Sequence, residues 1–127
     1  MEPRTHKSIN EKLCGHPVSL ALGQATVEME ATAEMAADDR GLIHGGFVFG
    51  MADYAAMLAV NDPYVVLGAA EARFLRPCQV GDKLTATAEV QEEKGKKRLV
   101  QVYVRRNGED IFSGTFTCFA LEHHVLD

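Results

Sequence analysis

The sequence has 127 residues, enough for one domain with its own hydrophobic core and no need of disulfide or metal staples. Its 46% hydrophobic and 24% charged residues are ordinary for a globular protein and exclude a disordered, collagen-like or coiled-coil chain. The net charge of −5 argues against a nucleic-acid coat, so we expect no nucleic-acid partner.

The N-terminal residues do not predict a secretory signal, and no segment predicts a membrane span. The longest uncharged stretch, from Gly41 up to Asp53, is shorter than the about 20 residues that cross a bilayer. No apolar segment follows the N-terminal residues, so we expect no secretory signal, no membrane association and a cytoplasmic protein. The three cysteines are odd in number and far apart, and the histidines lack metal-ligand spacing. We therefore expect neither disulfides nor a metal site.

The first half of the chain predicts a strand followed by a helix. Residues 1–18 form a variable N-terminal segment, in which 8–13 are compatible with a short helix. From Gly23 to Met35 apolar and polar residues alternate, which predicts a long strand with one face in solvent. After a turn at 38–41, the apolar segment 47–60 predicts a helix of ~21 Å, ended by Asn61-Asp62-Pro63. This helix has no polar face, so it must be covered on nearly all sides.

Four further strands are predicted at 65–74, 83–91, 98–106 and 110–121. Asn107-Gly108 is a strong two-residue hairpin signal between the last two strands. One curved antiparallel sheet of five to six strands, wrapped around a single buried helix, satisfies both patterns. The predicted class is α+β, with a single domain over residues 1–127.

Asp53 is the only ionisable residue between His44 and Asp62, and it lies in the middle of the apolar helix. An unpaired carboxylate on a covered helix costs several kcal/mol. One interpretation is that Asp53 lies on a patch left open by the sheet, or accepts a hydrogen bond from a backbone amide. The functional interpretation is a base or nucleophile in a partly dry cleft, where burial raises its pKa.

Gly45 and Gly46 stand where the helix begins, although glycine inside a helix costs roughly 1 kcal/mol relative to alanine. Glycine allows a ligand to approach the free amides, and the positive end of the helix dipole then stabilises an anion such as an oxyanion. The alternative is that the glycines only allow the helix to pack on the sheet. His44 is a candidate N-cap or a residue that orients this loop.

Gly45 and Asp53 are eight residues apart, which is ~12 Å along a helix axis. One carbonyl carbon cannot contact both. If they act together, they belong to different copies of the chain, and two antiparallel helices across a two-fold axis would form two shared sites. The chemistry therefore requires a homodimer.

The sequence resembles the hotdog-fold acyl-CoA thioesterases, in particular the branch of the phenylacetate-pathway thioesterase. The likeness covers residues 20–121 and is carried by His44-Gly45-Gly46, by Asp53 at its fixed offset, and by the segment 72–82, Ala-Arg-Phe-Leu-Arg-Pro-Cys-Gln-Val-Gly-Asp. It implies hydrolysis of an acyl-CoA thioester without a further cofactor, CoA being part of the substrate. The Gly45 amide polarises the carbonyl, and Asp53 of the other subunit activates water or attacks. It also implies dimers that pair into tetramers.

Two positions depart from that family. Relatives often carry Asn where this chain has Asp38, and Ser or Thr on the strand after the helix, where residues 65–70 hold no hydroxyl. The predicted catalytic residues are Asp53, Gly45 and His44. The predicted substrate-binding residues are Gly46, Asp38, the acyl-pocket residues Tyr54, Phe49 and Met57, and the cations Arg73, Arg76, Lys96 and Lys97, with Lys94 and Arg98 as further candidates for the nucleotide; a solvated turn is the alternative for this basic cluster.

Two other functions fit the same fold, since a fold does not determine an activity. A hydratase would want a histidine paired with an acid in a different motif, which the sequence lacks. A non-catalytic acyl-CoA sensor would use the same pocket but would normally be fused to a DNA-binding segment, for which 127 residues leave no room. Tight binding without turnover would favour the sensor.

Overall fold

The computed structural model describes residues 1–127, which form one long helix, two short helical turns and six strands. In chain order the elements are α1 (Glu11–Cys14), β1 (His16–Ala21), β2 (Gln24–Glu30), the 3-10 turn η1 (Ala33–Met35), α2 (Gly45–Val60), β3 (Val65–Phe74), β4 (Lys83–Lys94), β5 (Lys97–Arg106) and β6 (Glu109–Ala120).

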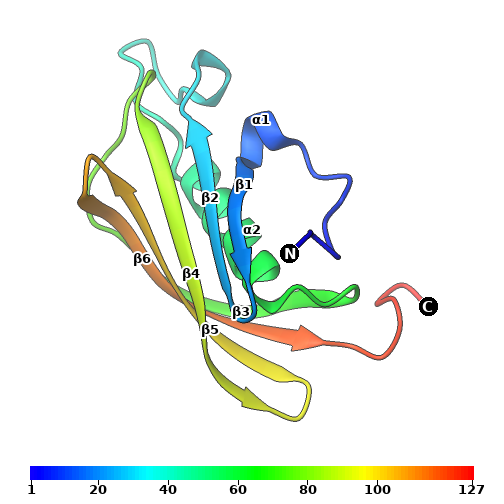
Figure 1. Cartoon of the computed structure of the whole chain (residues 1–127). Coiled ribbons are helices and arrows are strands. Elements are labelled where there is room, and N and C mark those ends of the chain that lie inside the picture. Colours follow the sequence, from blue (N-terminus) through cyan, green and yellow to red (C-terminus); the bar gives the residue numbers. More distant parts are fainter.

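The six strands form one antiparallel sheet in the order β1-β2-β4-β5-β6-β3. Figure 1 shows the sheet curving around α2. Asn107 and Gly108 form the predicted hairpin turn between β5 and β6, and both have positive φ (52° and 78°), as a tight primed turn requires. The predicted α+β architecture, a curved sheet around one long helix, is confirmed.

The central helix α2 packs against β2, β4 and β5, and its buried side chains belong to a hydrophobic core of 27 residues. Residues Tyr54 to Ala59 are all buried in sequence, so both sides of this part of the helix are covered. The helix begins at Gly45, two residues before the predicted start, and ends at Val60 as predicted. No helix of the structure is long and apolar enough to span a membrane.

The predicted strand from Gly23 to Met35 is too long. Strand β2 ends at Glu30, and Ala33–Met35 form a 3-10 turn in which the Met35 amide donates to the Thr32 carbonyl. Alanine, glutamate and methionine are good helix formers, so the alternation there does not enforce an extended backbone. The turn still buries Met35 completely.

Strand β1 (His16–Ala21) lies in the region that the sequence left unassigned. It is an edge strand that pairs only with β2, and none of its six residues is buried. An edge strand tolerates Pro17, because one side of its backbone needs no partner. Without a buried face, β1 has no apolar alternation to reveal it.

The N-terminal segment lies against the C-terminal end of α2. Asn61 takes the left-handed conformation that ends the helix (φ 50°), and its amide donates to the Met57 carbonyl at 2.8 Å. Its side chain accepts from the Arg4 amide at 2.7 Å and donates to the Glu2 carbonyl at 3.0 Å. Asn61 thus joins the helix end to a segment nearly 60 residues earlier in the chain.

Candidate active site on the central helix

The N-terminus of α2 leaves the Gly45 N–H free. His44 is the N-cap, and its Nδ1 accepts from the Gly46 amide at 2.8 Å, so this nitrogen carries no proton. The Phe47 amide donates to the His44 carbonyl at 3.1 Å. The Gly45 amide has no hydrogen-bond partner in the chain. It stands at the positive end of a 16-residue helix and can donate to an oxyanion.

Both glycines have close neighbours, and only Gly46 is required by its neighbour. A Cβ on Gly46 would lie 2.8 Å from His44 Nδ1, so a side chain there would break the cap. A Cβ on Gly45 would lie 3.1 Å from Cε1 of Phe74, whose ring lies against the helix start. The His44-Gly45-Gly46 motif therefore combines a histidine cap with a glycine that lies beside the Phe74 ring.

Asp53 lies two turns further along α2 and is only partly exposed. Its Oδ1 is buried and has no hydrogen-bond partner in the chain. Burial raises the pKa of this carboxyl from 3.8 to about 6. The interpretation that Asp53 is satisfied by a backbone amide is therefore wrong for Oδ1. A carboxylate held without a partner is a better base than a solvated one.

Two thiols lie near Asp53, one at the end of α1 and one on β6. Burial, and after it the charge of Asp53, raises the pKa of Cys14. The same two causes raise the pKa of Cys118 to about 12, so this thiol stays protonated. These neighbours of Asp53 could not be identified from the sequence pattern. A thiol is a weak hydrogen-bond donor, which accords with a carboxylate that remains unpaired.

The Gly45 amide and Asp53 do not meet within one chain. Eight residues of regular helix separate them, which is ~12 Å along the axis of α2. A site that uses both groups must take the second from another molecule.

The predicted acyl-pocket residues lie mostly inside the core. Tyr54 and Met57 are 3% and 1% exposed, so neither presents a surface to a ligand in this structure. Phe49 is half-buried against the rings of Phe112 and Phe116, at centroid distances of 6.4 and 5.4 Å. Their role as an acyl pocket stays a prediction.

Asp38 shapes the turn before the motif. Its Oδ1 accepts from the Arg40 amide at 3.0 Å and the Leu42 amide at 3.1 Å. The side chain lines an open polar cleft of about 580 Å³ that also includes Arg40 and Arg106. Arg40 has no ion-pair partner, and the sequence did not single it out.

The predicted cations fall into two separate groups. Arg76 pairs with Glu109 at 3.3 Å, while the exposed Arg73 has no ion-pair partner. Lys96 and Lys97 lie at the turn between β4 and β5. The 77–82 turn, which lies beside Gly45, precedes the other end of β4. The length of β4 therefore separates the two turns by roughly 35 Å. Lys96 pairs with Glu122 and Arg98 with Glu93, both on the surface. Within one chain, this basic turn and the Gly45 amide are not brought together.

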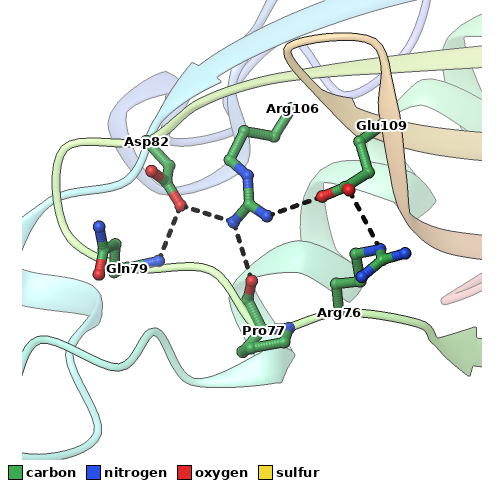
Figure 2. A network of polar contacts seen from close by, with 6 residues as sticks. All are labelled: Arg76, Pro77, Gln79, Asp82, Arg106 and Glu109. Carbon is green, nitrogen blue, oxygen red and sulfur yellow. Dashed lines mark hydrogen bonds and ion pairs between the residues drawn. The ribbon is translucent and has the colours of Figure 1, made fainter.

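Figure 2 shows a network that fixes the turn after β3. Arg106 donates to the Pro77 carbonyl at 2.9 Å, to Asp82 at 3.1 Å and to Glu109 at 3.0 Å. Glu109 also pairs with Arg76, and Asp82 accepts from the Gln79 amide at 2.9 Å. The segment that carries Phe74 against Gly45 is thereby tied to the β5–β6 hairpin.

No group of three or more His, Cys, Asp or Glu side chains in the structure could hold a metal ion.

Residues 34–119, which include the whole of α2, match the family model of the acyl-CoA thioesterase N-terminal domain. The chain belongs to the hotdog-fold acyl-CoA thioesterase family. The sequence resemblance to this family is thus confirmed, and the free amide and Asp53 lie inside the matched region.

Among solved structures, the protein PH1136 from Pyrococcus horikoshii superposes with a TM-score of 0.99 and 54% identity, covering 100% of this chain and 98% of that one. PaaI from the phenylacetic acid degradation operon of Escherichia coli has a TM-score of 0.80 and 28% identity, with 88% and 83% covered. The same bacterium's acyl-coenzyme A thioesterase PaaI is 40% identical over 78 residues, which are 60% of this chain and 55% of that protein.

Two further relatives have different names. A methylthioribose-1-phosphate isomerase of Aquifex aeolicus is 48% identical over 123 residues, which are 96% of this chain but only 27% of that protein. The transcription factor FapR of Caldanaerobacter subterraneus is 28% identical over 93% of this chain and 60% of its own length. The chain therefore spans only part of both relatives.

Proposed function

We propose that this chain hydrolyses an acyl-CoA thioester to CoA and a carboxylic acid, at a site shared by two copies. The observation that carries the proposal is the pair of unsatisfied groups on one helix: the Gly45 amide without an acceptor and the buried Asp53 oxygen without a donor. Leaving the buried Asp53 oxygen unpaired costs stability, and a thioester carbonyl with its attacking water would use both groups.

In the proposed reaction the thioester oxygen accepts a hydrogen bond from the Gly45 amide. Asp53 of the second copy takes a proton from a water that attacks the carbonyl carbon, or its carboxylate attacks directly and forms an anhydride that water then cleaves. The negative charge that develops on the carbonyl oxygen lies at the helix N-terminus. The C–S bond breaks as this intermediate collapses, and the CoA thiolate leaves and takes up a proton.

Strand β3 supports the proposal of a second copy. It is the last strand of the sheet, so one side of its backbone has no partner strand. Residues Gly68 to Phe74 are all exposed, and the small Ala69, Ala70 and Ala72 allow close approach. An exposed edge of this length is a template for pairing with another chain. Antiparallel pairing of two β3 strands would set the two α2 helices antiparallel, and we propose that such homodimers pair into tetramers.

The reaction needs no resident cofactor or metal, and we propose that it takes place in the cytoplasm. All three cysteines are unpaired, and two of them are buried. Free thiols of this kind are compatible with a reducing compartment.

Binding of an acyl-CoA without hydrolysis is the second candidate. The match to FapR regulators favours it, because their similarity covers 86% to 93% of this chain. Such a domain would keep the amide and a pocket for the acyl group but would not need Asp53. The two functions are therefore distinguished by turnover and by the effect of removing the carboxylate.

The test compares Asp53→Asn with wild type on a panel of short, long and aromatic acyl-CoAs, with thiol release as the readout. We expect kcat to fall at least about 100-fold in Asp53→Asn, because the variant lacks the base. Asp39→Asn is the matched control, since Asp39 is exposed and makes no polar contact. Equal turnover by Asp53→Asn and wild type would remove Asp53 from the mechanism, and binding without any turnover would favour the second candidate.

A further inference from the structure

An apolar cavity opens beside the free amide. It has a volume of about 350 Å³ and includes Gly45 in its wall, with Ile43, Val48 and Ile111 forming much of its apolar surface. The Phe74-Leu75 pair forms another part of the wall. The one charged residue at the cavity is Arg76, which already pairs with Glu109.

The Phe74 ring is the part of the cavity wall that lies beside Gly45. One edge of the ring faces Gly45, and the ring makes a T-shaped contact with Phe112 at a centroid distance of 5.2 Å. Phe74 is nevertheless 57% exposed, and the neighbouring Leu75 is 48% exposed. Two large exposed apolar side chains beside an apolar cavity mark a surface that gains from being covered by an apolar group.

The backbone holds this wall in place. The amides of Leu75 and Arg76 both donate to the Ile111 carbonyl, at 2.9 and 3.3 Å. The next residues are fixed by the contact between Arg106 and the Pro77 carbonyl, shown in Figure 2. The Ile43 amide donates to the Cys78 carbonyl at 2.9 Å, which fixes the opposite wall. The cavity is therefore built from segments that are tied to the sheet.

The apolar cavity adjoins the polar cleft described above. Pro77 and Cys78 line both spaces, while Asp38, Arg40 and Arg106 line only the polar one. A molecule with one apolar and one polar end fits such a pair of spaces, with its reactive carbonyl at the Gly45 amide between them.

We infer that the acyl group of the substrate occupies the cavity at Ile43, Val48 and Ile111, and that Phe74 sets the length of acyl chain the site accepts. The inference rests on the proposed function and names its substrate class. About 350 Å³ is at the small end of ligand cavities, so the favoured acyl group is short to medium in length. It is uncharged, because a terminal carboxylate would be buried with no free cation.

The test measures kcat/KM for straight-chain acyl-CoAs of increasing length, and for succinyl-CoA, with wild type, Phe74→Ala and Phe74→Trp. Phe74 is more than half exposed, so both variants should fold. We expect Phe74→Ala to move the optimum to longer chains and to lower kcat/KM for the shortest substrates about tenfold. Phe74→Trp should move it to shorter chains. Succinyl-CoA should be a poor substrate for all three proteins.

Leu22→Ala is the matched control, since Leu22 is 91% exposed in the β1–β2 turn, away from the cavity. The same proteins are titrated by calorimetry with non-hydrolysable thioether analogues of acyl-CoA. If wild type binds these analogues but hydrolyses no acyl-CoA, the proposed hydrolysis fails while the length selectivity is still measured from binding. Identical length profiles in wild type and both Phe74 variants would overturn the inference, as would a failure to bind any analogue.

Discussion

The two ends of α2 differ in how their polar groups are satisfied. At the C-terminal end, the backbone amide of Asn61 donates to a carbonyl of the last helical turn. The Asn61 side chain is only 7% exposed and forms hydrogen bonds with the backbone of Arg4 and Glu2. At the N-terminal end, the Gly45 amide has no partner and an apolar cavity opens beside it. One end is sealed by the chain, and the other is left open.

The contrast between the two helix ends concerns which polar groups the chain pairs and which it leaves unpaired. The chain supplies side-chain caps where it needs them, as Asn10 does for α1 and His44 for Gly46. It leaves unpaired the two groups to which the proposed mechanism assigns a role, the Gly45 amide and Asp53. A fold selected for stability alone would pair the Asp53 oxygen, because an unsatisfied buried polar group costs about 1–3 kcal/mol.

The largest expected effect comes from removing the free amide alone. Gly45 is the first residue of α2, where proline is well tolerated, and the preceding His44 has an extended ψ of 126°. Gly45→Pro should therefore fold but lose about 10²–10³-fold in kcat. Gly45→Ala adds the same Cβ against Phe74 and keeps the N–H, so it should retain most of the activity. A proline variant as active as the alanine variant would show that the amide is not used.

The second effect is on stability and concerns the other unpaired group. The carboxyl of Asp53 has a pKa of about 6 when folded and 3.8 as its ordinary value. Between these pH values the folded chain keeps a proton that the unfolded chain loses, so stability falls as pH rises through about 6. Asp53→Asn removes this loss and should gain up to about 3 kcal/mol relative to wild type between pH 4 and pH 8.

Urea unfolding at pH 4, 6 and 8 measures this gain. The Asp39→Asn control should keep a constant difference from wild type, because that side chain is exposed and makes no polar contact. A constant difference for Asp53→Asn as well would mean that the carboxyl is solvated.

The smallest effect is at the sealed end. Asn61→Ala removes two hydrogen bonds of a buried side chain and places alanine in a left-handed conformation, so it should lose about 2–3 kcal/mol of stability. Asn61→Gly keeps the conformation and should lose less. Both variants should keep the wild-type kcat at temperatures where they are folded. A large drop in kcat for the folded variants would mean that the N-terminal segment also supports the site.

Much of the fold could be predicted because its patterns are local. The bounds of β3 agree with the prediction, and the hairpin at Asn107-Gly108 follows from two residues that accept positive φ. The helix α2 was visible from its uninterrupted apolar composition, and Asp53 stood out as its one charge. A charge in an apolar segment is a strong signal because its cost is independent of the details of the fold.

Contacts between distant parts of the chain could not be predicted. Phe74 lies against Gly45, 29 positions earlier in the chain. The family resemblance identified the segment 72–82 but did not reveal the contact between Phe74 and Gly45. The bonds of Asn61 to Arg4 and Glu2 depend on where the N-terminal segment lies in space. Tyr54 and Met57 look like pocket residues in sequence, but the curvature of the sheet encloses them.

The central claim is that each site takes Gly45 from one copy and Asp53 from another. It is tested by co-expressing Asp53→Asn and Gly45→Pro chains with different tags and isolating the mixed population. Each parent should be inactive, whereas each isolated mixed dimer has one of its two sites with both groups intact, so about half of wild-type activity should return. Mixed assemblies that are no more active than the parents would contradict the claim.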